Sequence, residues 1–336
     1  MVKAHRTYDN DGSMSKKVVV ATHGHCFDGL ASAALFADML RRVEGGALSF
    51  HYLAMGYGPG EGANIAKLLT GDLNAVLDYR FTAAPRLTWY FDHHVTAFAG
   101  DAERAAFAER APLGRFFHDG AYGSCAKLIR DTAEQRFGLD MSVHASLVEW
   151  ADRIDTASFD DASQAVDTTE PVLRLRAVVQ RHGDGAFLRG LVPRLLEPGG
   201  LARLASADDV ARAYEPIARE EARFREAAAK HGQRMGDVVL VDLADVPLDA
   251  TSSFVVYELF FDCRYSVLLT RAKTGIYKLS VGYNPWSGRP RTHDIAAICE
   301  RYGGGGHPVV GGISRPASGL ADARAVAQEI AVALQA

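Results

Sequence analysis

Aspartates, histidines and one cysteine gather at three places in the first half of the chain, each at the end of a short apolar run. They are His23, Cys26 and Asp28 after residues 17–22, Asp78 within residues 75–79, and Asp92, His93 and His94 after residues 87–91. Carboxylates and imidazoles brought together repel one another or lose hydration unless a cation neutralises them. Because mixed oxygen and nitrogen ligands suit Mn²⁺, and less specifically Mg²⁺, Fe²⁺ or Zn²⁺, these residues predict a divalent metal site wherever the fold unites them.

The apolar runs have the length and composition of buried parallel strands, and helical patterns alternate with them. Residues 17–22 are β-branched, and residues 30–42 then repeat apolar side chains at helical spacing. Ser124 is the expected N-cap of a helix through Ala133, and a further helical pattern covers 143–151. This alternation predicts an α/β fold with a doubly wound parallel sheet, in which the loops at the carboxyl ends of the strands share one crevice.

The second half of the chain predicts a smaller α/β domain behind a helical connection. Residues 202–232 are rich in Ala, Arg and Glu, which indicates either a long helix joining two domains or an ordinary helical subdomain. We expect a first domain at 17–200, a helical linker at 201–236 and a second domain at 237–336. Its patterns predict strands at 238–243, 253–259, 265–270 and 277–282, and helices at 294–301 and 321–334.

Composition limits the class of protein. The chain has 336 residues, of which 48% are hydrophobic and 23% charged, so it is not largely disordered. Its net charge of −4 gives no sign of binding to duplex nucleic acid or to an anionic membrane, although a small nucleotide needs only a local basic cleft. The four cysteines form no CxxC pair, and the first 16 residues are polar and charged. We therefore expect a soluble protein of the reducing cytoplasm with no signal peptide.

Four segments of the first domain resemble the motifs of the DHH phosphoesterases. They are the His23-x-x-Cys26-x-Asp28-Gly29 loop, Asp78 in VLDY, Asp92-His93-His94, and Asp152 in EWAD. The second domain resembles the DHHA1 domain of the same superfamily, through GGGGH at 303–307 followed by glycines at 311 and 312. The resemblance runs from about Lys17 to the end of the chain. The three letters DHH are weak by themselves, but DHH followed much later by GGGGH is a specific combination.

This resemblance implies a two-metal site, with Mn²⁺ as the expected cation, and a role for each matching residue. Asp78 would bridge the two cations. The remaining ligands would be His23 for the first cation and Asp28, His93 and Asp152 for the second. His94 would contact the scissile phosphate, and Asp92 would orient the neighbouring histidines and fix their tautomers.

The fourth motif has two candidate aspartates. Asp152 and Asp155 both lie in the stretch ADRID. We prefer Asp152, because an Ala-Asp pair after an apolar helix is closer to the family's arrangement. Asp155 is the alternative.

The first motif departs from the family's common form. That form carries two aspartates, and Cys26 occupies the first of these places; His23 also lies one residue closer to Asp28 than usual. A variant with the pattern HxxCxDG exists in the superfamily. Two interpretations stay open: Cys26 is a thiolate ligand that favours softer metals, or it is a buried spectator beside a single tightly bound cation.

The second domain is expected to bind the substrate. Residues 262–301 contain seven Lys or Arg against three Asp or Glu, which suits an anionic ligand. Glycines lack a β-carbon, so their amides can approach a phosphate closely. The candidate substrate-binding residues are Gly305, Gly306, His307, Asn284 and Arg264. We expect them to face the metal residues across a cleft between the domains.

The resemblance thus implies a metal-dependent phosphoesterase that acts on dinucleotides, short oligonucleotides or a bisphosphate nucleotide. Two other functions are retained. One is an exopolyphosphatase-like hydrolase of inorganic polyphosphate, which the shorter first motif suggests. The other is a nucleic-acid-binding module with impaired catalysis, which the replacement by Cys26 permits. The presence of all the other site residues argues for an enzyme.

Overall fold

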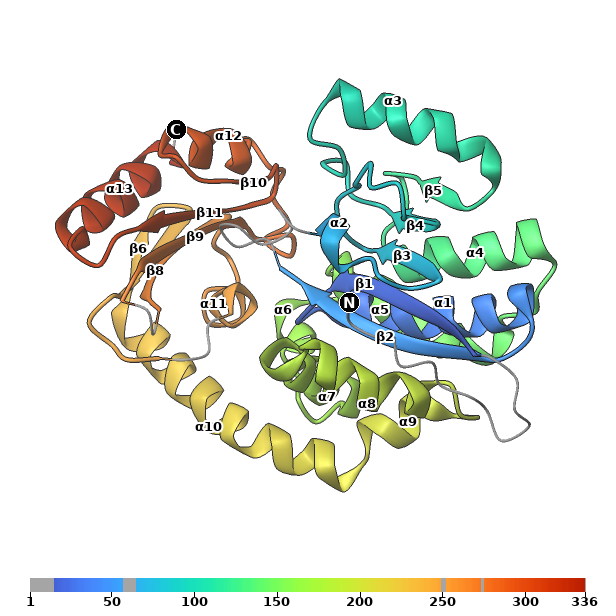
Figure 1. The fold of residues 1–336 in the computed structure, drawn as a ribbon. Coiled ribbons are helices and arrows are strands. Elements are labelled where there is room, and N and C mark those ends of the chain that lie inside the picture. Colours follow the sequence, from blue (N-terminus) through green and yellow to red (C-terminus); the bar gives the residue numbers. More distant parts are fainter. Residues whose placement is uncertain (1–14, 57–64, 249–251, 273–274, 336) are drawn as a thin grey trace. The chain divides into compact units, whose positions relative to one another are not determined.

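A computed structural model describes residues 15–56, 65–248, 252–272 and 275–335. Its contacts divide the chain into two compact units. The first contains the chain up to Ser158 together with Thr169–Ala211, and the second contains Phe159–Thr168 together with the chain from Arg212 onward. The helix α10 (Asp208–His231) passes from the first unit into the second. Figure 1 shows the elements of both units, which are described separately below.

The first unit is built on a five-stranded sheet in which every pair of neighbouring strands is parallel. In chain order the strands are β1 (Lys16–His23), β2 (Leu48–Met55), β3 (Leu73–Leu77), β4 (Trp89–Asp92) and β5 (Phe116–His118), and their order in the sheet is β2-β1-β3-β4-β5. This is the doubly wound arrangement whose strand order reverses between β1 and β3. The predicted α/β class with a parallel sheet is confirmed.

Helices and connecting segments cover both faces of this sheet. On one face lies α1 (Phe27–Glu44), which packs against α4 (Cys125–Phe137) and α5 (Ala145–Asp155). The other face packs with α2 (Ile65–Leu68) and with the aromatic segment that precedes α3 (Asp101–Arg110). Because both faces are buried, Val18 to Ala21 of β1 are all inaccessible to solvent, as the uninterrupted apolar run predicts.

The rest of the first unit consists of short helices. They are α7 (Pro171–His182), α8 (Gly185–Leu195) and α9 (Gly200–Ala205), with 3-10 turns at Ala111–Leu113 and Ser142–His144. The helices α7 and α8 also pack on α1, which explains why α1 has buried residues on all sides.

The ends of α4 and α5 fix the backbone near the metal cluster described below. Ser124 is the N-cap of α4, and its Oγ accepts a hydrogen bond from the Lys127 amide at 3.2 Å, so the predicted cap is confirmed. After α5, Ala157 has a positive φ of 52°. The amides of Ala157 and Ser158 then bond back to the carbonyls of Ile154 and Arg153, which is a Schellman ending.

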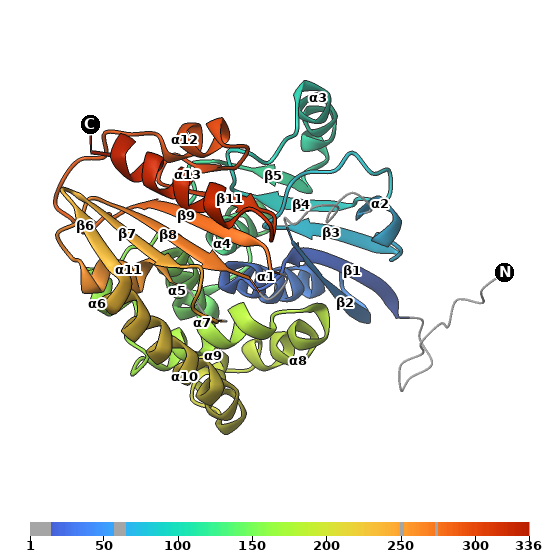
Figure 2. The same cartoon turned by 90° about the vertical axis from the view of Figure 1, so that its left-hand side faces the viewer.

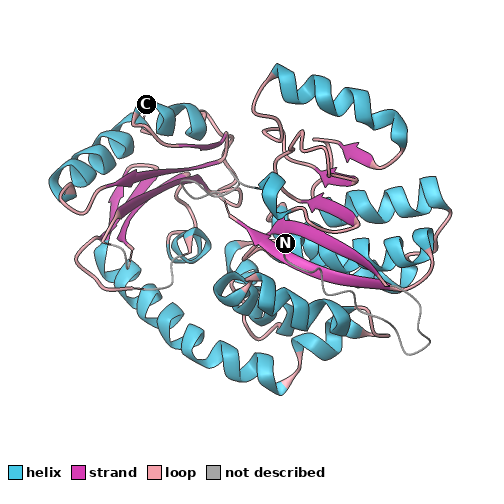
Figure 3. Ribbon diagram, viewed as in Figure 1, coloured by secondary structure: helices cyan, strands magenta, loops and turns pink. Residues whose placement is uncertain are grey.

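The second unit is a six-stranded sheet between two helical layers (Figures 2 and 3). Its strands are β6 (Gly232–Met235), β7 (Val238–Leu243), β8 (Tyr265–Arg271), β9 (Tyr277–Tyr283), β10 (Gly305–His307) and β11 (Val310–Arg315), in the order β10-β11-β9-β8-β7-β6. Among these described strands, β7 and β8 pair in parallel and the other neighbours pair antiparallel. One face packs against α12 (Ile295–Arg301) and α13 (Leu320–Ala333), and the other against α10, α11 (Ser253–Leu259) and α6 (Ala162–Ala165).

The predicted strand at residues 253–259 is wrong, because this segment is the helix α11. Its β-branched and aromatic residues favour a strand by propensity. In the folded unit Val255, Val256 and Tyr257 are buried in the cluster that contains Val239 and Val241 of the sheet. Burial of one helical face on the sheet therefore outweighs the local preference. Within the described residues, no helix has the length and apolar character needed to cross a membrane.

Candidate metal centre

The sequence-predicted residues meet at the carboxyl ends of three neighbouring strands. His23 ends β1, Asp78 directly follows β3, and Asp92 ends β4 with His93 and His94 behind it. These strands lie side by side as β1-β3-β4, beside the point where the strand order reverses. Ligands of open parallel sheets bind in the crevice at this point.

His93 is the centre of the cluster. Its Nε2 lies 3.4 Å from Asp155 Oδ2, 3.5 Å from Asp78 Oδ1 and 3.8 Å from Asp28 Oδ2. Its Nδ1 lies 3.1 Å from the Tyr122 carbonyl oxygen, so Nδ1 donates there and Nε2 is the nitrogen that faces the carboxylates. Three carboxylates therefore converge on one imidazole nitrogen.

Among the residues that the structure describes, three overlapping groups of donor atoms are compact enough to hold metal ions. They are His23, Cys26 and Asp78; Asp78, His93 and His94; and Asp28, His93 and Asp155, each with its ligand atoms within 4.8 Å of one another. Asp78 and His93 each belong to two of the groups. This sharing is what a site for more than one cation requires.

Asp28 is held by the start of α4. Its Oδ2 accepts a hydrogen bond from the Cys125 amide at 2.7 Å, and its Oδ1 accepts one from the Ala126 amide at 3.0 Å. The free amides of a helix N-terminus favour a negative charge. The whole Asp28 residue is 1% exposed. Its carboxylate has a fixed orientation toward His93.

Asp92 supports the two histidines that follow it. Its Oδ1 accepts hydrogen bonds from His94 Nδ1 at 2.7 Å and from the His93 amide at 2.9 Å, while Tyr90 donates to its Oδ2 at 3.1 Å. His118, at the end of β5, donates from Nε2 to the His94 carbonyl at 2.9 Å. These bonds fix the backbone at residues 93 and 94 and the orientation of the His94 ring. The sequence does not identify His118, because its hydrogen-bond partner is a backbone atom.

Asp78 adopts a backbone conformation that costs energy. Its φ is 51°, in the left-handed region that side-chain-bearing residues rarely occupy, and its amide bonds to the Phe91 carbonyl at 2.9 Å. Outliers of this kind cost on the order of 1–3 kcal/mol and concentrate at functional sites. The turn directs the carboxylate between His23 and His93.

The electrostatics of the cluster show that it holds an excess of acidic groups. Burial and the charge of Asp78 raise the pKa of Asp155 to about 6, and the same two causes raise the pKa of Asp28. Burial opposes protonation of His93, but Asp78, Asp28 and Asp155 outweigh it and raise its pKa to about 10. Burial disfavours the ionised form of Asp78 and acts to raise its pKa. Its histidine partners outweigh burial and lower the pKa of Asp78 to about 2.

Two atoms of the cluster are buried without a hydrogen bond of normal geometry, Asp78 Oδ2 and His93 Nε2. A buried polar atom with no partner is costly, so such atoms call for a ligand. Carboxylate oxygens and imidazole nitrogens at these distances are the donors that divalent cations such as Mn²⁺ prefer. The donor set therefore fits a divalent metal ion.

Asp155, rather than Asp152, reaches the cluster. Asp155 ends α5, and its carboxylate lies beside His93. The Asp152 carboxylate turns instead to α4, with Oδ2 at 3.1 Å from Lys127 Nζ and Oδ1 at 3.3 Å from Ser124 Oγ. One turn of helix separates the two residues, and their carboxylates have different partners. The geometry thus groups Asp155, the alternative that the sequence left open, with the other donors, and which aspartate binds metal stays a prediction.

Cys26 lies at the cluster as a free thiol. Its sulfur is within the group formed with His23 and Asp78, and the residue precedes the first turn of α1. Burial, followed by the charge of Asp78, raises its pKa. Both interpretations of its role, ligand or spectator, are compatible with this position.

The second unit contains the other expected residues, and the Asn284 side chain is bonded within its own unit. Asn284 is fully buried, its Nδ2 donates to the carbonyls of Phe261 and Cys263, and its Oδ1 accepts from the Trp286 amide. Both N–H groups of this inaccessible amide are already donated, so the side chain holds its own turn together. Trp286 packs within the same unit and donates from Nε1 to the Phe159 carbonyl at 2.7 Å.

The glycine segment forms the β10–β11 hairpin. His307 pairs with Val310 in the hairpin, and its side chain lies outside what the structure describes. Gly306 has a φ of 153°, and a β-carbon there would lie 2.2 Å from the Val310 carbonyl oxygen. The close approach of the two strands therefore explains this glycine without a phosphate. Arg264 Nη2 lies 3.4 Å from Asp237 Oδ2, so this ion pair already engages part of the guanidinium.

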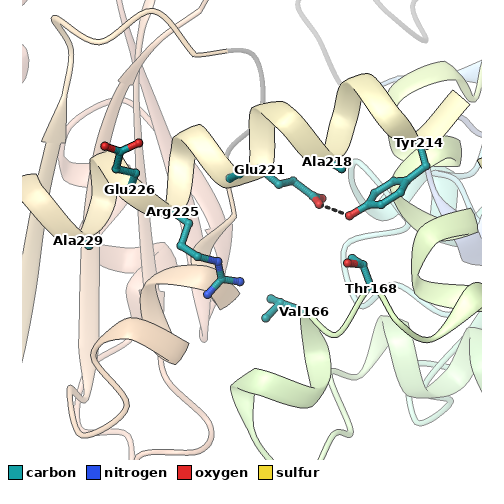
Figure 4. A pocket seen from close by; sticks show the side chains of 9 residues that line it. Val166, Thr168, Tyr214, Ala218, Glu221, Arg225, Glu226 and Ala229 are labelled. Atoms are coloured by element: carbon teal, nitrogen blue, oxygen red, sulfur yellow. Dashed lines mark hydrogen bonds between the residues drawn. The ribbon is translucent and has the colours of Figure 1, made fainter. Parts of the chain in front are cut away.

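A groove in the second unit runs along α10, with a volume of about 420 Å³ (Figure 4). Its lining includes Val166, Thr168 and Arg225, and Tyr214 donates to Glu221 Oε2 at 2.6 Å across part of it. None of its lining residues belongs to the metal cluster or the glycine segment. The groove is separate from the site that the sequence predicts.

A parallel sheet of this order, with carboxylates and imidazoles gathered where the strand order reverses, defines an α/β protein with a divalent metal site. Comparison with solved structures shows that the fold is that of DHH-domain proteins. A pGpG-specific phosphodiesterase, PggH from Vibrio cholerae, matches with a TM-score of 0.67 at 17% identity, over 96% of this chain and 99% of that one. Exonuclease RecJ bound to manganese matches with a TM-score of 0.58 at 13% identity, over 95% and 90% of the two chains.

The DHH domain of a protein described as a member of a ribosomal protein family also matches, with a TM-score of 0.58 at 11% identity, over 96% of this chain and 88% of that one. No model of a protein family matches the sequence, and no curated protein matches it. Fold and site geometry, rather than sequence identity, therefore support the functional argument.

Proposed function

We propose that the protein is a metal-dependent phosphodiesterase that hydrolyses dinucleotides or other short nucleotides, with Mn²⁺ at a two-cation site. The observation that supports this most is the convergence of Asp28, Asp78 and Asp155 on His93, with two buried donor atoms that have no hydrogen bond of normal geometry. The solved proteins of the same fold support the substrate class, since one is a pGpG-specific phosphodiesterase and another an exonuclease bound to manganese.

The residues divide into ligands and supports. Asp78, shared by two donor groups, is the proposed bridge between the cations. His23 joins it for the first cation, and Asp28, His93 and Asp155 complete the second. A pair of bound divalent cations would supply charge stabilisation at the phosphoryl oxygens and activation of water.

The chain itself then provides orientation. Asp92 holds the His94 ring through Nδ1, which leaves Nε2 as the atom that His94 presents to the scissile phosphate. The bonds of His118 and Asp92 to the loop backbone keep this geometry fixed before the substrate arrives. The second unit would recognise the nucleotide through Gly305, His307 and Arg264.

The test is an activity panel with purified protein. Dinucleotides, longer oligonucleotides, a 3′,5′-bisphosphate nucleotide and inorganic polyphosphate are each incubated with Mn²⁺, with Mg²⁺, or with chelator. The proposal expects metal-dependent release of mononucleotides, fastest from the shortest substrates. Rapid phosphate release from polyphosphate without action on dinucleotides would establish the polyphosphatase instead. Oligonucleotide affinity without turnover under any metal condition would establish a binding module.

Asp78→Asn tests the site assignment. Removal of the bridging charge should lower activity on the best substrate at least about a hundredfold, the scale of losing a main electrostatic contributor to catalysis. Asp101→Asn is the matched control, because Asp101 is an exposed aspartate on α3 of the same unit. Activity of Asp78→Asn within a few-fold of the control would contradict the proposal.

A further inference from the structure

The charged network between α4 and α5 has no place in the reaction described above, although it borders the metal cluster. Lys127 and Asp152 form an ion pair at 3.1 Å, and Ser124 Oγ donates to the other Asp152 oxygen at 3.3 Å. We call these three residues the α4–α5 clamp. Their side chains belong to the first turn of α4 and the last turns of α5.

Each end of the clamp is attached to a proposed ligand. At the α4 end, Ser124 caps the same turn whose Cys125 and Ala126 amides hold the Asp28 carboxylate. At the α5 end, Asp155 lies one turn after Asp152. The two ligands are not bonded to each other, and both approach His93 Nε2, at 3.8 Å and 3.4 Å.

We propose that Asp152 is a positioning residue that joins the first turn of α4 to the last turn of α5 and so sets the separation of Asp28 and Asp155 across the metal site. This inference rests on the proposed function, since it assigns a purpose to residues around that site. It replaces the role of direct ligand that the sequence suggested for Asp152.

The packing beside the clamp leaves little room for the helices to shift. A β-carbon at Gly123 would lie 2.6 Å from Asp152 Oδ1 and 2.6 Å from Thr156 Cγ2. The Thr156 hydroxyl donates to the Asp152 carbonyl at 2.6 Å. The backbone before α4 thus lies against the Asp152 and Thr156 side chains, which would have to shift if position 123 carried a β-carbon.

The expected contribution of the clamp to global stability is small. The Lys127 and Asp152 side chains are 39% and 27% exposed, and pairs of this kind contribute about 0–1 kcal/mol. Its effect should be seen in metal binding instead. Loss of residues that orient metal ligands commonly lowers metal affinity about 10–100-fold.

The experiment measures Mn²⁺ affinity and stoichiometry for wild type, Asp152→Asn, Lys127→Gln and the double variant, by calorimetry and by electron paramagnetic resonance. Simple electrostatics predicts opposite effects, since loss of an aspartate should weaken cation binding and loss of a lysine should strengthen it. Positioning predicts that both single variants bind Mn²⁺ roughly tenfold more weakly at unchanged stoichiometry. The double variant should then be no worse than either single variant.

Glu149→Gln is the matched control, because Glu149 is an exposed acid on the same helix, and it should bind Mn²⁺ as wild type does. Unchanged or tighter binding by Lys127→Gln would overturn the inference. Loss of one bound cation in Asp152→Asn would overturn it too, by making Asp152 a ligand. Wild-type protein that binds no Mn²⁺ would contradict both the proposed function and this inference. If the wild type binds Mn²⁺ and Lys127→Gln binds it with the same affinity, only the inference is contradicted.

Discussion

Protons and divalent cations should compete for the cluster of Asp28, Asp78, Asp155 and His93, and the competition is measurable as a pH-dependent stability. The pKa of Asp155 is raised to about 6 and that of His93 to about 10, against about 3.9 and 6.5 in an unfolded chain. In both cases the folded state binds its proton more tightly than the unfolded state does. The metal-free protein should therefore lose stability as pH rises through this range.

The size of the effect follows from the two shifts. One pKa unit corresponds to about 1.4 kcal/mol, so between pH 5 and pH 8 the pKa shift of His93 gives a loss of about 2 kcal/mol. The pKa shift of Asp155 would give about 1.4 kcal/mol, which solvent screening of its partly exposed carboxylate reduces to about 1 kcal/mol or less. Because the two groups contact each other, part of the loss is shared, and we expect about 2–3 kcal/mol in all. For a unit of this size that corresponds to a fall in Tm of roughly 5–10 °C.

The assay is thermal unfolding followed by circular dichroism at pH 5, 6, 7 and 8, with chelator or with saturating Mn²⁺. In chelator the Tm should fall as pH rises, and the rise in Tm on adding Mn²⁺ should be larger at pH 8 than at pH 5. Asp155→Asn should show a weaker pH dependence and a smaller response to Mn²⁺, while Asp101→Asn should behave as wild type. A chelator-treated Tm that stays level or increases from pH 5 to pH 8, with a metal response independent of pH, would refute this reasoning.

Three further outcomes are expected. Cys26→Ala should keep the full content of bound metal if the thiol is a spectator and lose part of it if the thiol is a ligand, and elemental analysis of the purified variant distinguishes the two. Ala157→Gly should raise the free energy of unfolding by up to about 1 kcal/mol, because glycine removes the cost of the positive φ of 52°. Denaturant titration measures this free energy, and a decrease would show that the conformation of Ala157 is unstrained. His307→Ala should raise KM for a dinucleotide more than KM for a small generic phosphodiester while leaving metal content intact, and equal losses on both substrates would remove the recognition role of the second unit.

The sequence predicts which strand-end residues lie together because parallel strands impose a simple geometry. An apolar run followed by a polar residue places that residue at one edge of the sheet, which is why the sequence alone groups His23, Asp78 and His93. The Ser124 cap is equally accessible, since one hydroxyl and one amide three residues later define it.

What the sequence does not predict depends on the direction of side chains within longer elements. Asp152 and Asp155 are a turn apart on one helix, and only the packing of α5 against α4 shows which of them faces the cluster. The bonding of Asn284 also depends on residues distant in the sequence. Its side-chain amide donates to the carbonyls of residues 261 and 263, and no local pattern links these residues to it. The helix at 253–259 has the local pattern of a strand, since its β-branched residues are buried by distant parts of the chain.

The wide distribution of the metal donors along the chain has a consequence for biosynthesis. The donors come from the end of β1, the start of α1, the ends of β3 and β4, and the last residue of α5. If these donors are the ligands, a nascent chain that has not yet released α5 from the ribosome would lack a complete set, and full loading of a cation would wait until most of the first unit has been made. A cation bound by these residues would act as a reversible cross-link between the first strand and the fifth helix. It should protect the folded unit against proteolysis in the way that a covalent bridge protects a secreted domain.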